Sequence, residues 1–136
     1  MNLDLHYLCN LPMTSLLWTC TVVSISFDWW RIIEHAIDIS HNNIRDIDPE
    51  AFDELSYAFY FDASYNLLTN FSQIPMKFQK GIKLLNVSFN QIQDIPRSSF
   101  PKLYELASID FSHNNITDVG RSVFSTLFSI RHLNFR

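Results

Sequence analysis

The sequence predicts a parallel-strand solenoid of the α/β class, because similar segments recur every 24 residues and their apolar residues alternate. Four segments align without a gap, at residues 37–44, 61–68, 85–92 and 109–116. A fifth copy begins at Leu133. A sequence unit that recurs at one period buries its apolar face against the next copy, and the copies stack into an elongated coil.

Each unit is expected to open with a short strand. In the first copy Ile37 and Ile39 alternate with Asp38 and Ser40, so the apolar side chains point inward and the polar ones outward. Equivalent strands should stack in parallel and form the concave side of a horseshoe.

An asparagine follows each of the four strands at the same position. We expect these side chains to form a structural ladder, because an amide can pair backbone groups that are left open where a strand ends. The ladder residues are Asn42, Asn66, Asn90 and Asn114.

The remainder of each unit should return over the convex side in irregular or short helical segments. Phe52, Phe100 and Phe124 share one column there and are expected to stack as a spine. Ala58 and Ala63 stand where other copies carry larger aliphatic residues, which predicts weaker packing in the first two copies.

The pattern L-x-x-L-x-L-x-x-N-x-L with this period is the leucine-rich repeat signature, and it covers residues 35–136. The run from Ser40 to Leu55, S-H-N-N-I followed by a segment similar to A-F-x-x-L, resembles the extracellular class with 24-residue repeats. Within that class, IDISHNNI and IDFSHNNI resemble chaoptin and its relatives, which are adhesion proteins of insect photoreceptors. Toll-like receptors and secreted leucine-rich proteoglycans share most of the motif.

Residues 1–34 do not follow the repeat and are expected to form a separate segment. The stretch 7–27 carries no charge and is long enough to span a bilayer, but it contains Pro12 and several polar residues. A secretory signal, a divergent cap and unrelated sequence stay open as alternatives.

Composition excludes several functional classes. The 136 residues carry a net charge of -4, which does not suit a nucleic-acid-binding surface. Two glycines cannot build a phosphate loop, and two cysteines cannot build a disulfide framework or a four-ligand zinc site. No cofactor or metal is expected.

Two segments resemble parts of a catalytic triad, Asp38-Ser40-His41 and Asp110-Ser112-His113. The same columns read Asp62-Ser64-Tyr65 in the second copy, which keeps the pattern and loses the chemistry. A triad also needs an oriented base and an oxyanion hole. We therefore expect a protein that is not an enzyme.

Two rows of side chains on the concave side suggest a surface for binding another protein. One row is polar and acidic, and the other is aromatic, the residue type that dominates binding hot spots. The residues expected to contact a partner are Tyr60, Asp62, Tyr65, Lys83, Phe89 and His113.

Three N-x-[ST] sequons begin at Asn70, Asn86 and Asn115. They are glycosylation candidates only if the protein is secreted.

The resemblance implies a cell-surface adhesion module whose partner is a like or unlike surface protein, without nucleic acid. Attachment to the membrane would come from parts outside this stretch. Two alternatives stay open: the ectodomain of a Toll-like or other signalling receptor, and a cytosolic scaffold that regulates an enzyme.

Overall fold

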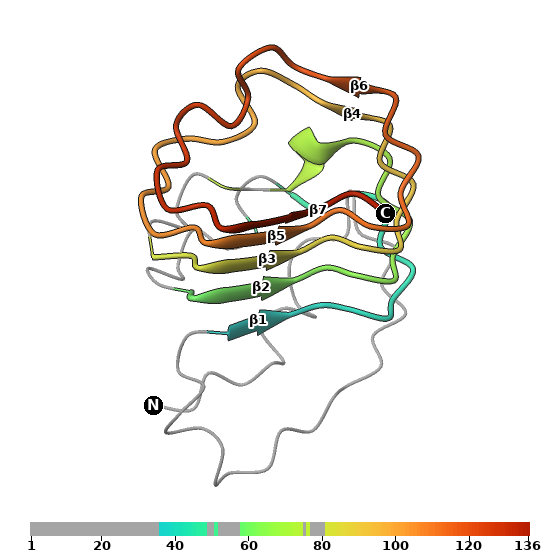
Figure 1. Ribbon diagram of the computed structural model, residues 1–136. Coiled ribbons are helices and arrows are strands. Elements are labelled where there is room, and N and C mark those ends of the chain that lie inside the picture. The colour runs from blue at the N-terminus through green and yellow to red at the C-terminus, as the bar shows by residue number, and fades with distance from the viewer. Residues whose placement is uncertain (1–35, 49–50, 52–57, 75, 77–80) are drawn as a thin grey trace, which may run out of the picture.

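The computed structural model describes residues 36–48, 51, 58–74, 76 and 81–136. The chain winds as a coil in which each turn contributes one short strand to a five-stranded parallel sheet (Figure 1). Strand order follows the sequence: β1 (Ala36–Asp38), β2 (Tyr60–Asp62), β3 (Leu84–Asn86), β5 (Ser108–Asp110) and β7 (His132–Asn134). The solenoid predicted from the 24-residue period is confirmed.

The register of the sheet reproduces the sequence period. Ala36 pairs with Tyr60, Tyr60 with Leu84, and Leu84 with Ser108, so each residue lies beside the one 24 positions later. In β1, β2, β3 and β5 the central residue points inward, and Ile37, Phe61, Leu85 and Ile109 are all buried.

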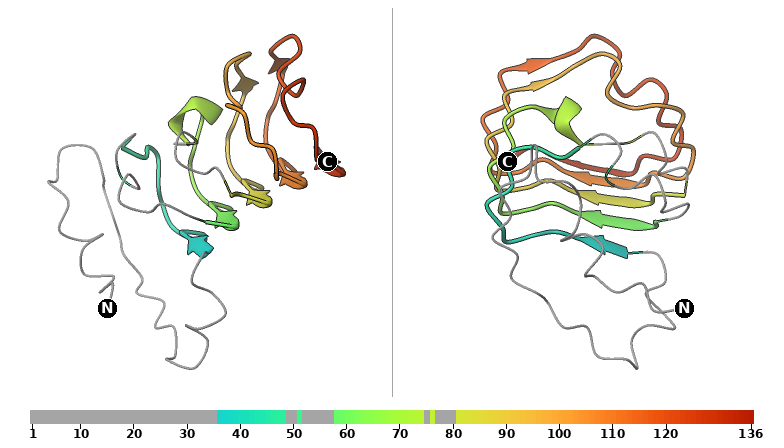
Figure 2. Two further views of the ribbon diagram at one scale, coloured as in Figure 1. Left: turned by 90° about the vertical axis from the view of Figure 1, so that its left-hand side faces the viewer. Right: turned by 180° about the vertical axis from the view of Figure 1, so that it is seen from behind.

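The wall opposite the sheet is irregular, as predicted. It carries the short 3-10 helix η1 (Phe71–Gln73) and a second parallel sheet of two strands, β4 (Asp94–Ile95) and β6 (Asp118–Val119). The two walls are separate in both views of Figure 2. Between them lies a single apolar core that runs along the coil.

Phenylalanine rings connect successive turns through this core. Phe100 and Phe124 pack as their shared column predicts, with ring centroids 5.6 Å apart. Phe71 and Phe111 come from other columns and also join the chain, since Phe71 lies 4.9 Å from Phe100 and 5.4 Å from Phe111. Phe71 thus extends the stack beyond the predicted column, which carries Met76 in the turn of Phe71.

Ala58 and Ala63 are both completely buried. The same turn contains Phe61, a larger side chain than Leu85 or Ile109 at the equivalent positions. Phe61 supplies volume that the two alanines lack.

The predicted non-repeat segment 1–34 and Phe52 lie outside the described residues. Within the described part, no helix has the length and hydropathy needed to span a membrane.

Candidate functional site

The asparagines after the strands connect each turn to the preceding one. The Asn66 Oδ1 atom accepts a hydrogen bond from the backbone N–H of Ile44 at 3.0 Å, and its Nδ2 donates to the carbonyl of Ile39 at 2.9 Å. Asn90 and Asn114 make the equivalent bonds one and two turns later. The second, third and fourth turns are thus each bonded to the preceding turn by one asparagine side chain.

Asn42 differs from these three. Its Nδ2 donates to the carbonyls of Ile39 and Ser40, while its Oδ1 is buried and has no hydrogen-bond partner among the described residues.

A row of carboxylate and amide side chains closes the strand ends. The side-chain oxygen of each accepts a hydrogen bond from the backbone N–H of the serine two residues later, at 2.8–3.1 Å. The row consists of Asp38, Asp62, Asn86 and Asp110. Because these bonds are local, the first task of the row is to hold the turn that follows each strand.

Asp62 lies in the middle of that row and is only 8% exposed, whereas the sequence predicts that it contacts a partner. The Tyr60 hydroxyl donates to its Oδ2 at 2.5 Å, and Asn86 Nδ2 donates to the same oxygen at 3.0 Å. Two neighbouring polar side chains therefore cover the carboxylate that was expected to meet a partner.

Two ionisable groups in this area have shifted pKa values. Burial and the hydrogen bond to the nearby Asp62 carboxylate raise the pKa of Tyr60 to about 12. Burial also acts to raise the pKa of Asp110, but hydrogen bonds from Ser112 and Asn134 outweigh it, and the pKa lies below its usual value.

Four rings form a continuous stack one position beyond the serines. The rings of His41, Tyr65, Phe89 and His113, which we term the aromatic column, have successive centroids 4.0–4.2 Å apart and interplanar angles of 8–18°. Parallel strands repeat at about 4.7–4.9 Å, so equivalent rings on successive turns fall close to stacking distance.

The backbone of the aromatic column lies in the left-handed region. The four φ angles are 52–54°, a conformation that residues other than glycine adopt rarely. Such a conformation costs about 1–3 kcal/mol per residue, and the surrounding ladder bonds hold it. Tyr65 is 44% exposed and Phe89 38% exposed, so the middle of the column reaches solvent.

Lys83 lies on the loop before β3, at the N-terminal ends of the strands, whereas the aromatic column follows their C-terminal ends. Its Nζ stands 4.7 Å from the centroid of the Phe59 ring and 3.6 Å from a carboxylate oxygen of Glu105. Lys83 therefore belongs to a second, charged cluster across the sheet from the aromatic column.

The residues of the triad-like segments make structural contacts with their neighbours. The Asp110 carboxylate takes hydrogen bonds from Ser112, while the His113 ring stacks on Phe89. Among the described residues, no three His, Cys, Asp or Glu side chains converge as metal ligands would.

The three sequon asparagines have different surroundings. Asn86 lies at the end of β3 and both atoms of its amide are hydrogen-bonded. Asn70 caps η1 and accepts hydrogen bonds from the backbone and hydroxyl of Ser72. Asn115 is exposed.

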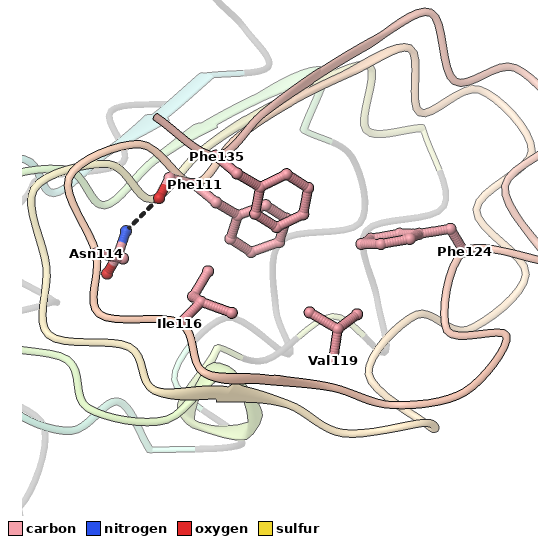
Figure 3. A pocket seen from close by; sticks show the side chains of 6 residues that line it. All are labelled: Phe111, Asn114, Ile116, Val119, Phe124 and Phe135. Atoms are coloured by element: carbon pink, nitrogen blue, oxygen red, sulfur yellow. Dashed lines mark hydrogen bonds between the residues drawn. The ribbon is translucent and has the colours of Figure 1, made fainter.

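An open hollow of about 350 Å³ lies at the C-terminal end of the coil (Figure 3). Phe111, Phe135 and Phe124 line it together with Ile116 and Val119. Among the described residues that line it, Asn114 alone has a polar side chain, and its amide makes the ladder bonds. The hollow therefore offers apolar contact and no arrangement for catalysis.

Sequence reasoning placed the aromatic residues in one row but missed their face-to-face stacking and their positive φ angles. The stacking could have been predicted, because a ring side chain recurs every 24 residues and parallel strands lie close to the ring-stacking distance apart.

Comparison with known proteins supports the repeat assignment. A leucine-rich repeat family model matches residues 80–136, and a second leucine-rich repeat model matches residues 35–55. No curated protein matches the chain.

Among solved structures, the crystal structure of the TLR13–ssRNA13 complex is similar, with a TM-score of 0.55 and 22% sequence identity. The match covers 79% of this chain and 19% of the other, so it shows a shared fold along about a fifth of that receptor chain. Folds of this kind generally serve as non-enzymatic scaffolds that bind other proteins. The period, the stacked parallel strands and both family matches agree: the chain is a leucine-rich repeat protein.

Proposed function

We propose that this chain is a protein-recognition module of a cell-surface protein, and that it acts in adhesion between cells without chemical turnover. The observation that carries the proposal is the aromatic column. Four rings are held in a strained backbone conformation and the central two remain exposed, and exposed aromatic side chains on a rigid support are typical binding hot spots.

The stacking also indicates what a partner would meet. Each ring covers the face of the next, so the ring edges of Tyr65 and Phe89 point to solvent. Ring edges carry partial positive charge and favour the faces of other aromatic rings or carbonyl oxygens. A protein surface with aromatic side chains or open backbone carbonyls suits this column.

Protein is a better candidate partner than nucleic acid. The structural neighbour is a complex with single-stranded RNA, but this chain has 14 acidic against 10 basic residues. A phosphate backbone is attracted by a surplus of Lys and Arg, which the chain lacks.

An extracellular location suits the proposal, with attachment to the membrane by parts outside this stretch. The three sequons support it, because the N-x-[ST] motif is a glycan acceptor only in the secretory pathway. The repeat motifs resemble those of chaoptin-like adhesion proteins. That resemblance implies the same extracellular location and membrane attachment.

The test is an aggregation assay. Cells without adhesion of their own display the chain on a membrane anchor and are mixed with like cells and with candidate partner cells. Arrays on two apposed membranes multiply modest contacts, so we expect clusters, and we expect soluble chain to dissolve them by competition. Dispersed cells in every mixture would contradict adhesion and favour a signalling-receptor role.

A further inference from the structure

The three sequons differ in whether their amide nitrogen is available once the turns are stacked. N-glycosylation forms a bond between Nδ2 and C1 of the first sugar. The C1–O bond to a lipid pyrophosphate carrier breaks, its electron pair leaves with the pyrophosphate, and Nδ2 loses one proton. The product amide must then accommodate a sugar beside Nδ2 in the folded protein.

Asn86 is poorly suited to carry a sugar. Its Nδ2 donates to Asp62 Oδ2 at 3.0 Å and its Oδ1 accepts from the Ser88 N–H at 3.1 Å. It is half-buried on the central strand of the sheet, where the register places it between Asp62 and Asp110. A glycan there would compete with the side-chain contact between neighbouring strands.

Asn115 has the opposite properties. Its backbone N–H donates to the carbonyl of Ile92 at 3.0 Å, so the main chain is held by the preceding turn. The side chain is exposed, and so is Thr117, which supplies the hydroxyl of the sequon. The amide therefore stands in solvent on a rigid loop.

We propose that, of the sequons at Asn86 and Asn115, only Asn115 carries a glycan and Asn86 remains unmodified in the folded protein. The inference rests on the proposed extracellular function, because the glycan is added only in the secretory pathway. It also deepens that function. Asn115 follows His113 by two residues and both are exposed, so a glycan borders one end of the aromatic column and leaves Tyr65 and Phe89 as the open part.

The test maps occupied sequons on the full chain. The chain is expressed behind a cleavable secretion leader in cultured cells that N-glycosylate, so site choice is measured separately from whether the natural protein is secreted. Ser72→Ala removes the Asn70 sequon from every sample. Peptide N-glycosidase in ¹⁸O water then converts each glycosylated asparagine to labelled aspartate, which peptide mass spectrometry locates.

We expect one labelled site, Asn115, in the secreted Ser72→Ala chain. Thr117→Val should abolish the label while it leaves Asn115 in place, and Asn115→Gln should do the same. Ser88→Ala, which removes the Asn86 sequon, should change nothing. Label at Asn86, or secreted and folded chain without label at Asn115, would overturn the inference. Neither result depends on whether the chain clusters cells.

Discussion

At the scale of single residues, the asparagine column is the feature on which the fold depends most. Asn90 is buried, and its amide pairs with four backbone groups in two turns. Without Asn90, the Leu68 N–H would lie unpaired away from water, which costs about 1–3 kcal/mol. The other three groups are carbonyls, and they keep hydrogen bonds from Asn66, Asn114 and the Tyr65 N–H.

Asn90→Ala should therefore lower the free energy of unfolding by about 1–3 kcal/mol, the cost of leaving the Leu68 N–H unpaired. Gln91→Ala is the matched control, because Gln91 is the exposed neighbour. Urea denaturation followed by circular dichroism measures both. Equal losses of stability in the two variants would contradict the ladder.

Tyr60 should make stability depend on pH in the alkaline range. Its pKa is raised to about 12 in the folded chain, so the folded state favours the neutral hydroxyl. The stabilisation is complete below the unfolded value near pH 10 and is lost as pH rises through the folded value.

Urea midpoints at pH 9 and above should therefore fall more steeply with pH for the natural chain than for Tyr60→Phe. That substitution removes the titrating group and keeps the ring. Parallel pH profiles would show that the hydroxyl does not ionise differently on folding.

The sequence predicted which columns are polar but not which members of a column are buried. Asp38 and Asp62 look equivalent in the repeat, yet Asp38 is exposed and Asp62 is buried. Tyr60 and Asn86 both cover the Asp62 carboxylate, whereas the turn of Asp38 carries Ala36 at the position of Tyr60. A contact between two variable columns depends on side-chain conformation, which the period of the repeat does not determine.

At the scale of elements, each turn is a strand, a ladder bond and an irregular return. The strands and the ladder recur at one spacing and could be predicted to the residue. The return segments could not, because η1, β4 and β6 occupy related positions with different backbone structures. In η1 a local capping box between Asn70 and Gln73 decides the conformation.

Gly120 shows how closely the return segments pack. A Cβ atom at this position would lie 2.4 Å from the backbone nitrogen of Arg97 on the preceding turn, and the Gly120 N–H donates to the carbonyl of Ile95. No other residue fits without moving one turn against the other.

Gly120→Ala should cost about 1–3 kcal/mol of folding stability, as overpacked sites do. Arg121→Ala, at the exposed neighbour, should be close to neutral. Thermal and urea unfolding of the two variants makes the comparison. If Gly120→Ala were as stable as Arg121→Ala, the close approach of the turns beside β4 and β6 would be wrong.

At the scale of the whole molecule, the described sheet ends in an edge strand with apolar surroundings. In β7 Leu133 is 39% exposed, Phe135 beside it is 44% exposed, and Phe128 on the preceding loop is 77% exposed. An open strand edge next to apolar side chains invites pairing with another chain.

The isolated chain should therefore self-associate. Its weight-average mass in sedimentation equilibrium should rise with concentration, and fusion of a polar capping repeat after Arg136 should raise the monomer fraction. If the uncapped chain had the monomer mass at every concentration, the exposed strand edge would not mediate self-association.

The central claim is that the aromatic column contacts a partner protein, and the most direct measurement is clustering of cells that display matched variants. Tyr65→Ala/Phe89→Ala removes the exposed centre of the column. Lys102→Ala/Tyr104→Ala removes two exposed side chains between β4 and β5, one of them aromatic, as a control. Display level and thermal melting of each variant establish that it is folded.

We expect the column variant to raise the chain concentration needed for clustering at least about tenfold, equivalent to about 1.4 kcal/mol of binding, because hot-spot aromatics dominate such contacts. The control should cluster like the natural chain. Undiminished clustering by the folded Tyr65→Ala/Phe89→Ala variant would contradict the account, because binding would then lie outside the aromatic column.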